Sequence, residues 1–81
     1  MAHDALPDPT QEARYVNYFS LVHGRDEFLM VFGQVMPGDQ EPHFNLRLVT
    51  SPPYALALMN LLRKSLSNYT ESYGAIPEPE E

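Results

Sequence analysis

The amino-acid sequence predicts an α+β domain, in which a three-stranded antiparallel β-meander is followed by one long C-terminal α-helix. Two periodicities support this prediction. Up to Thr50, apolar residues alternate with a period of two, which is typical of strands; beyond Pro52 they recur every three or four residues, which is typical of a helix. Between the two patterns, Ser51 and two prolines end the strand and are typical of a helix N-terminus.

Three segments are rich in β-forming residues and bounded by turn residues. We expect a tight turn at Gly24-Arg25 between the first two strands, with His23 paired to Asp26 and Gly24 free to take a positive φ. The segment 37–42, rich in proline, glycine and acidic residues, is expected to be the second loop. The expected strands are Tyr15–His23, Glu27–Val35 and His43–Thr50.

The helix has signals at both ends. Ser51 is expected to be the N-cap and Pro52 to lie in the first turn, where no backbone donor is needed. Gly74 is expected to close the helix, and Pro77 prevents it from resuming. One face carries an apolar stripe formed by Ala55, Leu58, Met59, Leu62, Leu66, Tyr69 and Tyr73.

The predicted sheet has two apolar faces but only one helix to cover them. We expect the helix to cover the first face, formed by Phe19, Leu21, Phe28, Met30, Phe32, Phe44, Leu46 and Leu48. The second face would remain in water, and we expect it to be the interface of a homodimer, because large exposed apolar patches mark interaction sites. The expected interface residues are Val16, Tyr18, Val22, Leu29, Val31, Arg47 and Val49.

Length and charge limit the possible organisation. The chain has 81 residues, enough for one small domain, expected at 13–77 between a disordered N-terminal arm (1–12) and an acidic tail (78–81). The net charge of −6 comes from these ends, and the body between them is formally neutral, without the basic face that a nucleic-acid-binding module normally carries.

The absence of cysteine excludes disulfides, thiolate metal sites and cysteine catalysis. No apolar run approaches the roughly 20 residues of a membrane span. The first residues have neither the basic start nor the apolar block of a signal peptide. We therefore expect a cytoplasmic protein that does not bind membranes.

Four segments in the same order resemble the small proteins grouped as domain of unknown function 3467. They cover 13–19, 26–34, 48–58 and the final Tyr-Gly-x-Ile-Pro of 73–77. The resemblance spans nearly the whole expected domain; Pro53 is one departure from it. It implies a bacterial or archaeal protein without an assigned activity, and it supplies no catalytic residues.

No catalytic or metal-binding constellation can be assembled from the sequence. His23 and His43 are expected at opposite ends of the sheet, so with His3 they make a poor metal site within one chain. Ser51 is at a helix N-terminus, where a nucleophile can be activated, but capping accounts for it fully. Asp26 and Glu27 are adjacent on a strand and so point to opposite faces.

The sequence is most consistent with a non-catalytic, homo-oligomeric interaction protein that requires no cofactor. Its expected partners are a second copy of itself and another protein. Arg47 is expected to pair with an acid such as Glu27 or with a partner carbonyl. The alternative is a nucleic-acid-binding accessory protein that uses tyrosines together with Arg14, Arg47, Arg63 and Lys64 on a dimer surface.

Overall fold

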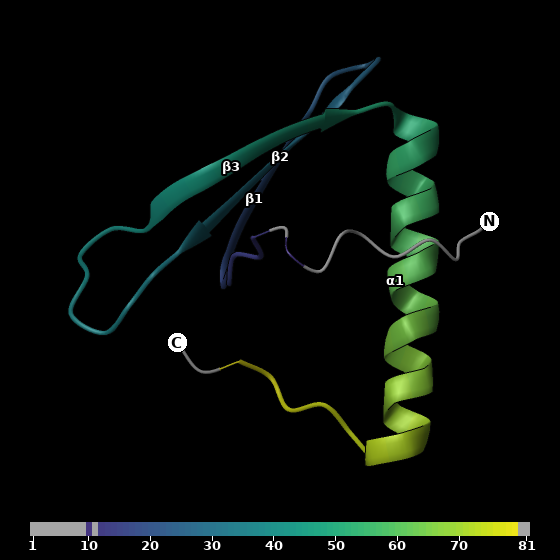
Figure 1. Cartoon of the computed structure of the whole chain (residues 1–81). Helices are drawn as coiled ribbons and strands as arrows, with labels where there is room; N and C mark the ends of the chain where they lie inside the picture. Colours follow the sequence, from purple (N-terminus) through teal and green to yellow (C-terminus); the bar gives the residue numbers. More distant parts are fainter. Residues whose placement is uncertain (1–9, 11, 80–81) are drawn as a thin grey trace.

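The computed structural model of the chain describes residue 10 and residues 12–79. Its elements confirm the predicted fold class. A sheet with the strand order β1-β2-β3 is antiparallel throughout and is followed by a single long helix, α1 (Figure 1). The expected N-terminal arm and acidic tail lie mostly outside the described residues. The elements are β1 (Tyr18–His23), β2 (Phe28–Gln34), β3 (His43–Thr50) and α1 (Pro52–Tyr73).

The first hairpin has a longer loop than predicted. His23 pairs with Phe28 rather than Asp26, and the loop 24–27 is closed by the Gly24 amide, which donates to the Glu27 carbonyl at 2.9 Å. Gly24 does not adopt a positive φ, so this expectation was also wrong. The predicted register was in error by two residues, and a shift of two leaves every side chain on its original face.

A β-bulge interrupts the pairing of β2 with β3. Phe32 pairs with Leu46 but Gly33 pairs with Phe44, which leaves Asn45 as an extra residue. The extra residue changes the alternation of β3, so the prediction that Phe44 lies on the first face was wrong. Its ring instead contacts Tyr18 on the second face, with centroids 5.4 Å apart at an interplanar angle of 73°.

Asn17 extends the sheet beyond β1 with its side chain. Its backbone amide donates to the Gly33 carbonyl at 3.0 Å. Its side-chain amide donates to the Val35 carbonyl at 2.9 Å and accepts from the Val35 amide at 2.8 Å. The carboxamide thus satisfies both polar groups of Val35, as a neighbouring strand would.

Both ends of α1 are confirmed. Ser51 has extended backbone angles (φ −83°, ψ 160°), and its Oγ accepts from the Tyr54 amide at 3.4 Å. The helix ends at Gly74, which has a φ of 94° and donates to the Thr70 carbonyl at 2.9 Å. A helix over Pro52–Tyr73 is about 33 Å long at the usual rise per residue.

Removal of the N-cap tests this helix start. Ser51→Ala leaves the first amides of α1 without their side-chain acceptor and should lower the free energy of unfolding by about 1 kcal/mol in urea titrations. Ser65→Ala, in the exposed middle of α1, is the control, and it should be neutral or slightly stabilising because alanine favours helices. Equal stability of the two variants would contradict the capping role.

The helix does not cover the sheet. Figure 1 shows α1 diverging from the sheet at the end of β3, and none of the described hydrophobic side chains is buried. Within the stripe, Leu58 is 46% exposed and Leu62 is 56% exposed. The prediction that the helix packs on the first face was therefore wrong for a single chain.

The connection between β3 and α1 explains this geometry. Ser51 is the one residue between the two elements, and it precedes a proline. A residue before proline favours extended conformations, so Ser51 continues the direction of β3 up to the start of the helix. With this short link, α1 leaves the sheet at the end of β3 and does not lie on its own first face.

Candidate interaction groove

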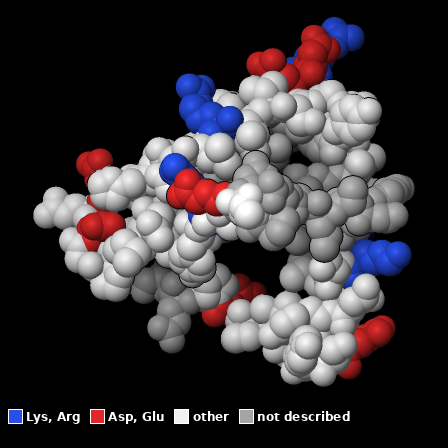
Figure 2. Space-filling view, viewed as in Figure 1, with Lys and Arg blue, Asp and Glu red and all other residues white. Residues whose placement is uncertain are grey.

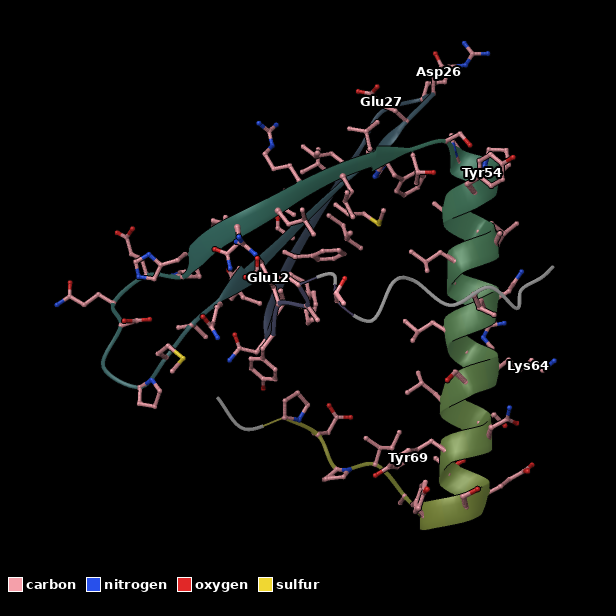
Figure 3. The ribbon with its side chains drawn as sticks, viewed as in Figure 1. Glu12, Asp26, Glu27, Tyr54, Lys64 and Tyr69 are labelled. Atoms are coloured by element: carbon pink, nitrogen blue, oxygen red, sulfur yellow. The ribbon has the colours of Figure 1, made fainter. Side chains whose placement is uncertain are left out.

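An apolar groove of about 780 Å³ separates the first face of the sheet from α1. Figure 3 shows side chains from both elements pointing into this space. No lining residue is charged or carries a polar side chain. We call this feature the sheet–helix groove; its lining residues are Phe19, Leu21, Phe28, Met30, Phe32, Pro52, Ala55, Leu56, Leu58, Met59 and Leu62.

The sheet side of the groove is an ordered aromatic surface. Phe19 and Phe32 are cross-strand partners whose rings meet edge to face, with centroids 5.7 Å apart. Phe28 stacks with His23 at 5.5 Å. Phe19 and Leu21 are still 60% and 65% exposed. The groove therefore offers a preformed apolar surface, which can bind another apolar surface but offers no acid, base or nucleophile for chemistry.

The second face holds most of the residues expected to form the interface. The register aligns Val22, Leu29 and Val49 across the three strands, and Val31 lies between Ser20 and Arg47. Tyr18, Val22 and Val49 are 40%, 56% and 64% exposed. This face is also open, with Phe44 as a member that the sequence did not predict.

Two residues of the expected interface differ from their predicted surroundings. Val16 precedes β1 and lines a smaller hollow of about 370 Å³ with Phe32 and Leu46, so it lies beside the first face. Arg47 forms no ion pair with any acid in the described part of the chain, so the expected pairing with Glu27 is not made there. The charged head of Arg47 remains exposed on the second face.

The residues considered for chemistry are not brought together. His23 is at the first hairpin, whereas the Nε2 of His43 is 3.9 Å from the Asp39 carboxylate in the second loop. His3 lies outside the described residues. Within residues 12–79 and Thr10, no three His, Asp or Glu side chains form a group that could hold a metal ion. Ser51 is engaged as a cap.

Basic and acidic groups are dispersed over the visible surface. In Figure 2 the Lys and Arg side chains occur in separate places, divided by uncharged surface, and some of them lie beside acids. Arg14 is 3.8 Å from Glu12, and Arg63 contacts the Met59 sulfur at 3.8 Å. In this view the bases do not form the continuous stripe that follows a nucleic-acid backbone.

Comparison with protein families identifies the chain. A model of the family described as "Protein of unknown function (DUF3467)" matches residues 3–78. The chain belongs to this family. The match includes every strand and the helix of the DUF3467 domain, which confirms the resemblance noted in the sequence. No curated protein and no solved structure gives a significant match.

The family description assigns no activity, so the function of this DUF3467 protein must be argued from its surfaces. In the described part of the chain, no helix has both the length and the hydropathy of a membrane span. The sheet–helix groove and the second face are the two surfaces on which exposed apolar side chains gather. The sequence indicated the second face, and it also indicated most of the residues that line the groove, but it predicted that the first face and the helix stripe pack against each other.

Proposed function

We propose that this DUF3467 protein is a non-catalytic, homo-oligomeric interaction protein. The observation that carries the proposal is the exposure of the apolar side chains on both sheet faces and on α1. A small domain is marginally stable even when it buries about 60% of its unfolded surface. A chain with no buried hydrophobic side chain among its described residues needs another surface to supply the missing burial.

The accessible surface gives the scale of that requirement. Many large apolar side chains of the sheet and of α1 are 40% to 76% exposed. An interface of standard size takes about 800 Å² from each partner. Both sheet faces and α1 therefore offer apolar surface that association of copies can bury.

Sedimentation equilibrium of the full chain at micromolar concentration tests the proposal. We expect a dimer or a higher oligomer, because burial of apolar surface is the dominant favourable term in association. A mass equal to one chain across the whole concentration range would contradict the proposed function.

Titration with a single-stranded oligonucleotide at two salt concentrations tests the nucleic-acid alternative. We expect no salt-sensitive binding. Phosphate contacts release counterions, so binding through Arg14, Arg47, Arg63 and Lys64 would have to weaken steeply as salt rises. Binding with such a salt slope would replace the present proposal by the nucleic-acid function.

A further inference from the structure

We infer that the sheet–helix groove is closed by a second copy of the chain, with the two helices exchanged. In this arrangement the stripe of each α1 packs on the first face of the other copy, and a two-fold axis relates the copies. The inference rests on the proposed homo-oligomeric function and adds to it the face that is used and the element that fills it.

The first step is that α1 does not fill the groove of its own chain. Ser51 is extended and is followed by Pro52 and Pro53, so the direction of the helix is set where β3 ends. A residue before proline favours extended conformations, so the chain continues in the direction of β3 up to the start of the helix. The first face is therefore open to a surface other than the helix attached to it.

The second step is that the two ends of the given sequence have too few apolar residues to replace the helix. Before Ala13 the sequence offers only Met1 and Leu6 as large apolar residues. After the helix, Ile76 is the one large apolar residue, and it is 46% exposed. Three side chains cannot cover the apolar surface that eleven residues form in the groove.

The third step is that α1 continues beyond the groove that it lines. The groove-lining part of the helix ends at Leu62, whereas the stripe extends through Leu66 and Tyr69 to Tyr73. These last residues are 46%, 49% and 76% exposed, and the two tyrosine rings contact each other at 4.9 Å. The far half of α1 thus carries apolar side chains beyond the groove; Figure 3 places Tyr69 on the side of the helix that faces the sheet, near the end remote from the strands.

The fourth step is that the chain is complementary to itself. The groove lacks charged residues, and the helix stripe lacks them too, so neither surface requires an oppositely charged partner. The ~33 Å helix is long enough to cross the eight-residue strand β3, about 26 Å long, in a partner copy. Two-fold symmetry buries both first faces and both stripes in one association step.

Two matched pairs of variants test which face is used. Met30 and Val31 are neighbours on the central strand and point to opposite faces, and Val31 lies opposite Arg47, which can pair with an introduced acid. Leu58 lines the groove, whereas Leu61 does not and is 67% exposed. The pairs are Met30→Glu with Val31→Glu, and Leu58→Glu with Leu61→Glu.

We expect Met30→Glu and Leu58→Glu to raise the dimer dissociation constant by on the order of 100-fold or more, because an unpaired charge would be buried. Val31→Glu and Leu61→Glu should remain dimeric by sedimentation equilibrium. The opposite result, with only the second pair dissociating, would place the dimer on the second face; the inference would then fail while the proposed function stands. A monomeric wild-type chain would contradict both.

A measurement on the wild-type chain avoids any dependence on the folding of the variants. In a mixture of isotope-labelled and unlabelled copies, filtered NOEs report only contacts between copies. We expect such NOEs between Leu66 or Tyr69 of one copy and Phe19 or Leu21 of the other. Inter-copy NOEs confined to second-face residues, or NOEs that place residues 1–12 of the same chain in the groove, would overturn the inference.

Discussion

Gly33→Ala should lower the free energy of unfolding by about 1–3 kcal/mol, because the new methyl group has no space at the bulge. A Cβ at this position would lie 2.6 Å from the His43 carbonyl oxygen and 3.0 Å from Cδ1 of Phe44. The first of these atoms belongs to the backbone of β3 and cannot move without displacing the strand. Gly33 is also the one buried residue in the described part of the chain.

The same substitution at Gly24 is a matched control. Nothing lies within 4 Å of a Cβ built on Gly24, and its φ is not positive. Gly24→Ala should therefore be neutral or stabilise the protein by about 0.4–1 kcal/mol, by restricting the unfolded chain. Urea titrations of both variants measure the difference, and equal stabilities would show that β2 and β3 do not approach so closely at Gly33.

The β-bulge is the feature of the sheet that alternation in the sequence did not predict. Alternation over β3 is regular in the sequence, so it predicted one face for Phe44, Leu46 and Leu48 alike. The extra residue Asn45 becomes visible only when β2 and β3 are paired, because the close approach at Gly33 is a property of two strands. The error in the first hairpin did not change the predicted faces, because a register shift of two residues keeps each side chain on the same face of the sheet.

The ends of the helix could be predicted from the sequence, whereas its position relative to the sheet could not. Its ends follow from Ser51, Pro52 and Gly74, which act on neighbouring backbone groups and can be recognised in the sequence. Its position relative to the sheet depends on how one linking residue directs the chain. The apolar stripe indicated that α1 needs a partner surface, but periodicity alone does not identify whose surface it is.

This distinction also affects the choice of interface. The second face was selected from the sequence on the premise that the helix covers the first face. With that premise removed, both faces are open; the groove has no polar side chain in its lining, whereas Ser20 and Arg47 interrupt the second face. Tyr18, Val22, Leu29, Val31, Arg47 and Val49 remain proposed contact residues, and the second face is then available for another protein.

Leu62→Ala should lower the free energy of unfolding by about 2–5 kcal/mol when the protein is dimeric, as expected for a buried leucine. In the single chain Leu62 is 56% exposed. Truncating a side chain that is only half buried should lower the free energy of unfolding by about 1 kcal/mol. The size of the loss therefore reports whether another chain covers the stripe. A loss at the upper end is comparable to the total stability of many small domains, which starts near 5 kcal/mol.

Urea unfolding at two protein concentrations separates the two situations. A dimer that unfolds to monomers becomes more stable as concentration rises, so the wild-type midpoint should shift upward. Leu61→Ala is the matched control, because Leu61 is 67% exposed and does not line the groove. Small, equal losses for the two variants, with midpoints that do not depend on concentration, would mean that the stripe faces solvent in the folded protein. A large loss confined to Leu62→Ala would instead require a covering surface, since the chain's own sheet does not provide one.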